Sequence, residues 1–400
     1  MRTVLYKREI DDLTASGYLN KDISVADALI EKFYNEIMGV EEKLLIDLML
    51  SDNPAQNKLD ELLKLWDIEV KQNSKSLLLA YFLKMHNTLK ATEYEEPRLK
   101  GLLLNQRFRN LQIFAHFTKI GKALNKKGII PLIFKGGAMK FLNPELPRYM
   151  GDIDVMVLEN QWTKSAKIAK SLGYWFKRLD IHSFDILENK DSQYGILDIH
   201  KFIHIGTKKE KKWINGLFKR ASEREVFGVR ALVPCFEDLL FITLINLSNN
   251  LRDHKSQANV LYAIFDCKFL IDNKDNFDWS IVIEDTKLAG AEVQINFATK
   301  FINKISEKIV PKELQVNNLF EKETNDYSQM IMFKNFYYVE LQTKSRAMKI
   351  QNVIKKPNML GEYLKLKIKY KTLKFLNKHP RLIEIFIKVF YSNKGINNAV

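Results

Sequence analysis

Cysteine and long apolar runs are scarce in this chain. Of its 400 residues only two are cysteines, Cys235 and Cys267, and their spacing fits neither a metal site nor a redox motif. This excludes a disulfide framework and indicates a reducing compartment, so no disulfide-linked partner is expected. No uncharged apolar run approaches the roughly 18 residues of a membrane span, and the first residues lack the apolar stretch of a signal peptide. We therefore expect a cytoplasmic protein.

Acidic residues are also scarce relative to basic ones, most of all near the C-terminus. The formal net charge is +15. Residues 344–378 hold eleven Lys or Arg and one acid, Glu362, and so carry +10. Such a segment favours a polyanionic partner, either RNA or an anionic membrane surface, although a solvated basic helix has the same composition.

Hydrophobic periodicity divides the chain into four regions. Residues 1–127 show helical spacing of apolar residues, and 128–234 mix short strand-like runs with brief helical stretches. Helical spacing returns over 235–340 and continues through the basic segment 341–400. We predict an α+β protein, in which a small mixed-sheet core is flanked by an N-terminal helical region, a helical domain and a basic helical C-terminal segment.

The segment FKGGAMKFLNPELPRYMGDIDVMV, residues 134–157, ends in a strand-like stretch with two aspartates. In a strand, alternate side chains share a face, so Asp152 and Asp154 would point together away from the core. Two such carboxylates can converge on a divalent cation, which prefers oxygen ligands. The same pattern also occurs on a wet edge strand.

Two glycines precede the aspartates, at the end of the apolar run IIPLIF. Gly136 and Gly137 open a short helical patch, where backbone N–H groups can approach an anion closely. The sequence is neither a Walker motif nor a GxGxxG fingerprint. The pair predicts a phosphate-binding turn, although a glycine pair is equally typical of a plain turn.

A third strand-like run, GILDIHKF, contributes Asp198 and His200 on one face. If this strand neighbours the Asp154 strand, Asp198 completes a cluster of three carboxylates. Three acids facing a phosphate site are typical of two-metal phosphoryl or nucleotidyl transfer. His200 could orient Asp198 or the substrate, or serve the structure alone.

The order of these elements resembles the polymerase-beta-like nucleotidyltransferase superfamily. The finer pattern is similar to a bacterial family of uncharacterised nucleotidyltransferases, and the resemblance covers roughly residues 100 to 305. The motifs that carry it are Lys135-Gly136, Arg148 before Asp152-Ile153-Asp154, Asp198-Ile199-His200, Pro234 to Asp238, Asp266 and Asp278-Trp279.

The resemblance implies a set of site residues and cofactors. It makes Asp152, Asp154 and Asp198 the catalytic carboxylates, which hold two Mg²⁺ or Mn²⁺ ions. The nucleoside triphosphate, with ATP as the expected donor, would be held by Gly136, Gly137, Lys135, Lys140, Arg148 and His200. Family members often carry histidines on the helix after Pro234 where this chain has Asn246 and Asn250.

The expected activity is metal-dependent transfer of a nucleoside monophosphate from an NTP to a hydroxyl or phosphate acceptor, with release of pyrophosphate. The acceptor could be a small molecule, a sugar, a peptide or RNA. Two alternatives stay open. One is a toxin or defence enzyme that modifies RNA or protein, and the other is a non-catalytic module that binds a nucleotide for regulation.

Overall fold

The computed structural model describes residues 25–314, apart from residues 52, 68–72, 87, 145, 147, 180–182, 189–195, 204, 206–208, 253–256, 307–308 and 311–313. The predicted basic segment 344–378 therefore lies outside the described residues, as does the whole of the region 341–400.

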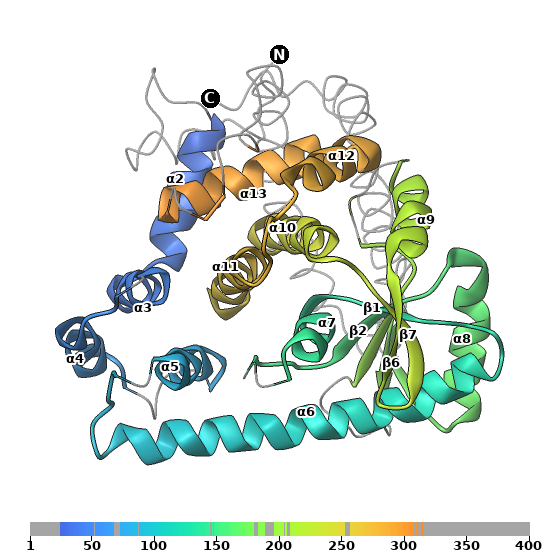
Figure 1. Ribbon diagram of the computed structural model, residues 1–400, viewed down its shortest axis with the longest axis horizontal. Helices are drawn as coiled ribbons and strands as arrows, with labels where there is room; N and C mark the ends of the chain where they lie inside the picture. The colour runs from blue at the N-terminus through green and yellow to red at the C-terminus, as the bar shows by residue number, and fades with distance from the viewer. Residues whose placement is uncertain are drawn as a thin grey trace, which may run out of the picture.

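The described residues form twelve helices and seven strands, arranged as Figure 1 shows. No helix among these residues combines the length and apolarity needed to cross a membrane. The helices are α2 (Val25–Ile37), α3 (Val40–Leu50), α4 (Gln56–Leu65), α5 (Asn73–Met85), α6 (Glu95–Asn125), α7 (Lys135–Leu142), α8 (Glu159–Ser171), α9 (Glu210–Arg220), α10 (Phe236–Arg252), α11 (Gln257–Asp272), α12 (Trp279–Ala289) and α13 (Glu292–Ile305).

All seven strands belong to one mixed sheet with the order β3-β4-β5-β2-β1-β7-β6. Its central strand β2 runs antiparallel to β1 and parallel to β5. The predicted α+β class, with a mixed-sheet core between helical regions, is confirmed. The strands are β1 (Leu132–Ile133), β2 (Ile153–Met156), β3 (Trp175–Leu179), β4 (Ser183–Leu187), β5 (Leu197–His200), β6 (Ser222–Val226) and β7 (Val229–Val233).

Helix α6 is the longest described element, with 31 residues, and at 1.5 Å per residue it spans about 46 Å. It ends at Asn125, and Gly128 then takes the left-handed conformation with φ of 73°. The amide of Ile129 donates to the carbonyl of Leu124 across this turn, which closes the helix and directs the chain into β1. The segment Lys126-Lys127-Gly128 therefore ends the helix.

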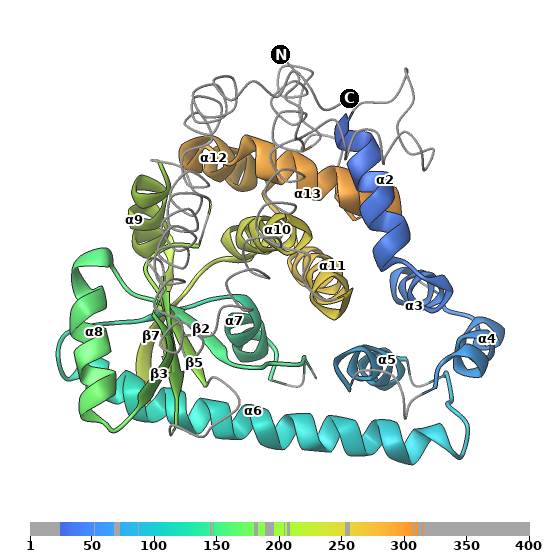
Figure 2. The ribbon, with the colours of Figure 1, turned by 180° about the vertical axis from the view of Figure 1, so that it is seen from behind.

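Helices α7 and α8 lie on opposite sides of the sheet (Figures 1 and 2). On α8, the Trp162 ring packs 5.2 Å from the Phe184 ring, and its Nε1 donates to the carbonyl of Ile199 at 3.3 Å. On α7, Gly137 lies so close to the sheet that a Cβ there would be 2.8 Å from Cγ1 of Ile153. These contacts fix the helices next to β4, β5 and β2.

The first and last described helices pack against each other, so the N-terminal helices contact the C-terminal ones. The rings of Phe33 on α2 and Phe297 on α13 meet edge to face at 6.3 Å. The Nζ of Lys300 lies 3.1 Å from a carboxylate oxygen of Asp27. Figure 2 shows α2 crossing α13 at the edge of the molecule opposite α6.

Candidate active site

Three aspartates lie side by side across three neighbouring strands. Asp154 on β2 is paired in register with Asp198 on β5, and Asp198 is paired with Asp185 on β4. Residues directly opposite on paired strands point to the same face, with Cβ atoms roughly 5 Å apart. The neighbouring of β2 and β5, on which the expected carboxylate cluster depended, is confirmed by this register.

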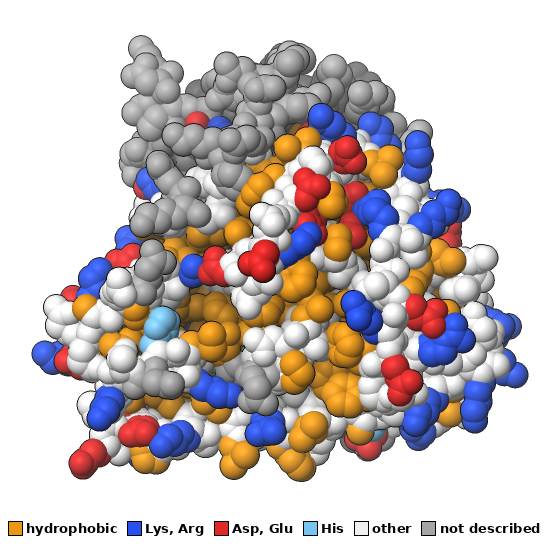
Figure 3. All heavy atoms as spheres, in the orientation of Figure 1, with side chains coloured by type: hydrophobic (Ala, Val, Ile, Leu, Met, Phe, Trp, Pro, Cys, Tyr) orange, Lys and Arg blue, Asp and Glu red, His pale blue; other side chains and the backbone are white. Residues whose placement is uncertain are grey.

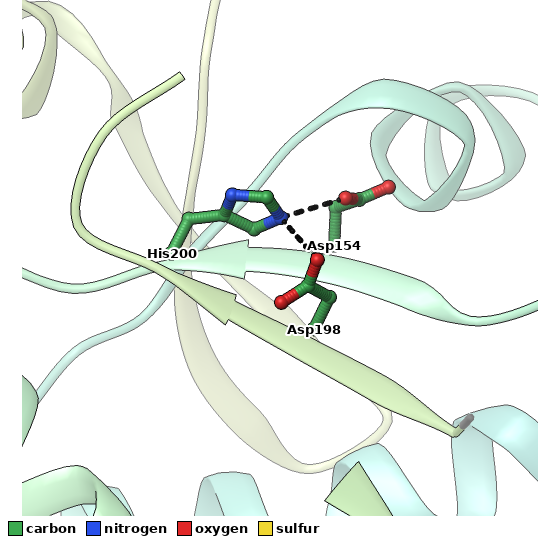
Figure 4. Close-up of side chains that lie close together, drawn as sticks. All are labelled: Asp154, Asp198 and His200. Carbon is green, nitrogen blue, oxygen red and sulfur yellow. Dashed lines mark hydrogen bonds and ion pairs between the residues drawn. The ribbon is translucent and has the colours of Figure 1, made fainter. Parts of the chain in front are cut away.

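His200 and Lys135 hold the Asp154 and Asp198 side chains from two sides. The Nε2 of His200 lies 2.9 Å from Oδ1 of Asp154 and 3.0 Å from Oδ2 of Asp198, as Figure 4 shows. The Nζ of Lys135, from the start of α7, lies 2.6 Å from the same Oδ1 of Asp154. The Oγ of Ser183 on β4 donates to Oδ2 of Asp198 at 3.4 Å.

The charges of the cluster follow from these contacts. Carboxylate and carbonyl oxygens can only accept here, so both ring nitrogens of His200, which also reaches the carbonyl of Phe202, carry protons. Burial lowers the pKa of His200, but the Asp198 and Asp154 carboxylates outweigh burial and raise it to about 9. Burial likewise raises the pKa of Asp154, yet the charges of Lys135 and His200 bring it below its usual range. Two cations therefore balance two carboxylates.

Asp154, Asp198 and His200 also form a set that fits a divalent cation, which would replace the proton on Nε2 of His200 when it binds. Each offers one ligand atom, and these atoms lie within 4.8 Å of one another. The Oδ1 of Asp198 is buried and has no hydrogen-bond partner among the described residues. A buried carboxylate oxygen without a partner is costly, and a metal ion would satisfy it. The two carboxylates suit Mg²⁺ or Mn²⁺.

Asp152 lies just outside this set. The strand β2 begins at Ile153, so Asp152 occupies the bend before it rather than the strand itself. Burial raises the pKa of Asp152 to about 7, and the negative charge of Asp154 acts in the same direction. The charge of Asp154 thus affects the pKa of Asp152, but Asp152 is not among the three residues whose ligand atoms lie within 4.8 Å of one another.

The N-terminus of α7 faces the cluster, because Lys135 is both its first residue and a partner of Asp154. Phe134, which precedes the helix, makes no side-chain hydrogen bond to cap it. Lys135 has φ of 51°, a strained conformation for a residue other than glycine, and such strain clusters at functional sites. The N–H groups of this first turn, which contains Gly136 and Gly137, are of the kind that bind phosphate.

Arg148 and Lys140, both predicted to contact phosphate, are held by protein groups. The guanidinium of Arg148 forms a two-pronged ion pair with Asp266 on α11, with Nε 2.8 Å from Oδ1 and Nη2 2.6 Å from Oδ2. The Cζ of Arg148 also lies 5.4 Å from the centre of the Tyr262 ring. The Nζ of Lys140 donates to the carbonyls of Pro144 and Leu146. Both cations thus hold the loop between α7 and β2.

The Arg148 guanidinium packs against Gly136, where a side chain would clash with it, and this contact leads to a stability prediction. A Cβ at Gly136 would lie 2.3 Å from Nη1 of Arg148. Gly136→Ala is therefore expected to lower the free energy of unfolding by about 1 to 3 kcal/mol, as overpacked cores do. Gly101→Ala in α6 is the matched control, because nothing lies within 4 Å of its Cβ, and it should stabilise the protein by about 0.5 to 1 kcal/mol. Urea unfolding of both variants measures this, and equal stabilities would contradict the close approach.

Asp185 was not predicted from the sequence as a site residue, although the pattern of its strand contains a signal for it. The run SFDIL alternates in the same way as LDIH, with Phe184 and Ile186 fully buried on one face and Asp185 on the other. Without a pairing partner, one acid in a strand is an ordinary surface residue. Only the register with Asp198 places Asp185 in the row.

The Pro-x-x-Glu-Asp motif lies away from the cluster and joins helices. Asp238 and Asp285 both accept from Nη2 of Arg220, at 2.5 and 2.7 Å. The Oε1 of Glu237 accepts from the amide of Asp278 at 3.1 Å, at the start of α12. These buried acids tie α10 to α9 and α12.

The seven-stranded mixed sheet thus carries a row of aspartates beside the N-terminus of α7. Residues 61–306 match the family model described as "Uncharacterised nucleotidyltransferase". The match spans more than half of the chain, and the chain belongs to this family. It begins well before residue 100, where the resemblance seen in the motifs begins, so it also includes α5 and all of α6.

Other comparisons add little. Among solved structures, the chain is similar to the antibiotic-resistance factor ANT(2″)-Ia, whose solution structure it matches with a TM-score of 0.26 and 14% sequence identity. That match covers 50% of this chain and 93% of the other, a likeness too slight to compare sites. No curated protein matches the chain.

Proposed function

We propose that the protein transfers a nucleoside monophosphate from an NTP to a hydroxyl or phosphate acceptor and releases pyrophosphate. One observation carries this proposal. The paired carboxylates of Asp154 and Asp198, one with a buried oxygen that has no partner among the described residues, lie beside the N-terminus of α7, where Phe134 makes no side-chain cap. Carboxylates for a cation and N–H groups for a phosphate are the two halves of a nucleotidyl-transfer site.

The carboxylate half would hold two divalent ions, Mg²⁺ or Mn²⁺. We assign Asp154 and Asp198 as ligands, with Asp152 as a further ligand from the bend before β2. Divalent ions held by these carboxylates would supply Lewis-acid chemistry, which lowers the pKa of an attacking hydroxyl and offsets the negative charge of a leaving pyrophosphate. Asp185, next to Asp198 in register, would face the acceptor side of the same row.

The phosphate half would consist of α7 and its lysine. The first-turn amides, including those of Gly136 and Gly137, would donate to phosphate oxygens, and Lys135 would add positive charge between the triphosphate and Asp154. Arg148 and Lys140 would act indirectly, since their charged groups already bind Asp266 and the carbonyls of the loop. His200, hydrogen-bonded to both metal-binding carboxylates, would orient them.

The same reasoning supports a division of the chain. Residues 128–234, which contain every described strand, would form the nucleotidyltransferase core, with ATP as the expected donor. Residues 1–127 and 235–340 would form the helical regions around it, and 341–400 a basic C-terminal segment. The acceptor would be a small molecule, a sugar, a peptide or RNA.

The test is turnover by the wild-type protein. Purified protein, Mg²⁺ and each NTP are incubated with a broad panel of acceptors, and pyrophosphate and labelled product are followed. The proposal expects many turnovers per protein molecule and no release in the presence of a chelator. Stoichiometric binding of the NTP without turnover would instead favour a nucleotide-binding regulatory module.

A further inference from the structure

Large apolar side chains are exposed in a row on α6. Leu104, Phe108 and Leu111 are 69%, 61% and 55% exposed. Their spacing of four and three residues places them on one face of the helix, and we call these three residues the α6 strip. On the same face the row continues as the exposed small residues Gly101 and Ala115. The opposite face of α6 is buried, so the strip is not part of the core.

The α6 strip lies on an open edge of the molecule. In Figures 1 and 2, α6 runs along one edge of the molecule, and α8 extends past it near its C-terminal end. Figure 3 shows apolar side chains along this lower edge, with Lys and Arg nearby. Among the described elements, the strip therefore lies on the outward side of α6, and a contiguous exposed apolar row can serve as an interaction surface.

Basic residues flank the α6 strip. Helix α6 carries six Lys or Arg and two acids, Glu95 and Glu96, which gives it a net charge of +4. The exposed basic residues of α6 and of the turn after it are Arg98, Lys100, Arg107, Lys119, Lys122, Lys126 and Lys127. A ridge with apolar side chains between cations is suited to a surface that is apolar inside and anionic outside.

A second exposed aromatic lies beside the C-terminal half of α6. Phe227, at the tip of the β6–β7 hairpin, is 52% exposed and has φ of 51°. This left-handed conformation is costly for a bulky side chain, and hairpins usually place Asn or Asp there. The Phe227 ring packs on Phe114 of α6, with 4.5 Å between centroids. The hairpin thus adds an exposed aromatic ring beside α6, in addition to its packing on Phe114.

We propose that the α6 strip, with Phe227, docks this protein on the surface of an anionic lipid bilayer. A second copy of the chain is a poor occupant, because two α6 helices would bring their basic residues together. A rigid protein partner is also disfavoured, because the strip has three large apolar side chains, whereas a stable interface uses about 20 to 30 residues on each side. Fluid lipid, in contrast, closes around a ridge, and its phosphates pair with the flanking Lys and Arg.

The test is co-sedimentation of the full chain with vesicles. Vesicles of phosphatidylglycerol and phosphatidylcholine are expected to bind the wild-type protein, and vesicles of phosphatidylcholine alone to bind it weakly. The triple variant Leu104→Ser, Phe108→Ser and Leu111→Ser should lose affinity for the anionic vesicles by about tenfold or more. The matched control substitutes serine at three apolar residues that are 64%, 45% and 59% exposed on other helices, and it should bind as the wild type does; these are Val40, Leu65 and Met85.

A second variant keeps the proposal falsifiable if the triple variant unfolds. In Phe108→Trp, emission from the added tryptophan is expected to be quenched by brominated lipid, beyond the quenching of the wild-type protein. Wild-type binding by the triple variant would overturn the proposal, because another segment, such as the basic residues 344–378, would then carry the affinity. No binding to anionic vesicles would overturn it too. A dimer in light scattering that the triple variant abolishes would assign the strip to a second copy instead.

Discussion

Asp198→Asn is expected to lower pyrophosphate release from NTP by at least about a thousandfold, and Asp154→Asn by a similar factor. Both carboxylates belong to the group of possible metal ligands. Loss of either negative charge should therefore weaken the binding of a divalent cation. A thousandfold loss corresponds to about 4 kcal/mol of transition-state stabilisation, which is within the range that metal ions supply. The measurement is the initial rate of pyrophosphate release at one fixed Mg²⁺ concentration that does not saturate the variants.

The control for these variants is Glu223→Gln on β6, an exposed acid that pairs with Arg230 at 2.6 Å. It should retain the wild-type rate, because it removes an acidic charge far from the row of aspartates in the sheet order. Asparagine is nearly isosteric with aspartate, so circular dichroism should report the same fold for all three variants. An Asp198→Asn protein that keeps more than a tenth of the wild-type rate would contradict the assigned role.

The second large effect is expected on stability, from Asp266→Ala. Asp266 and Arg148 form a buried pair with side-chain exposures of 4% and 15%. Burial raises the pKa of Asp266, and only the neighbouring guanidinium counters this. Removing the carboxylate leaves the Arg148 charge buried and uncompensated. We therefore expect the free energy of unfolding to fall by about 3 to 5 kcal/mol, as measured by urea denaturation.

Asp272→Ala, on the same helix, is the matched control for that substitution. Asp272 pairs with Lys268 at 2.6 Å, but its side chain is 50% exposed. Because exposed pairs contribute little, this variant should lose less than about 1 kcal/mol. Equal losses from the two variants would mean that α11 is fragile in general and that the Arg148 pair has no special weight.

The sheet around the site could be predicted from the sequence because its strands have a strong period of two. Ile153, Val155 and Val157 are fully buried, as their alternation with the acids indicates. The sequence predicted that Asp198 joins the Asp154 carboxylate only if the two strands are neighbours. The structure shows that β2 and β5 are neighbours and that Asp154 is paired with Asp198. The position of Asp152 was less predictable, because the strand could begin on either side of it.

Long-range partners were beyond the reach of local patterns. Arg148 and Asp266 are 118 residues apart in the chain, and no spacing rule joins a loop before a strand to the middle of a helix. Arg148 beside an acidic motif therefore suggested a phosphate contact, whereas the structure pairs it with Asp266. The exposure of the α6 strip could not be predicted from the sequence either, because apolar residues at helical spacing usually face a core.

Binding of Mn²⁺ by the wild-type protein and by Asp198→Asn tests the proposed site most directly. Isothermal titration, followed by electron paramagnetic resonance of the bound ion, measures affinity without requiring the acceptor to be known. The arrangement of Asp154, Asp198 and His200 leads us to expect Mn²⁺ binding by the wild-type protein and its loss in Asp198→Asn. A wild-type protein that binds no Mn²⁺, or a variant that binds it with unchanged affinity, would contradict the assignment of this cluster as a metal centre.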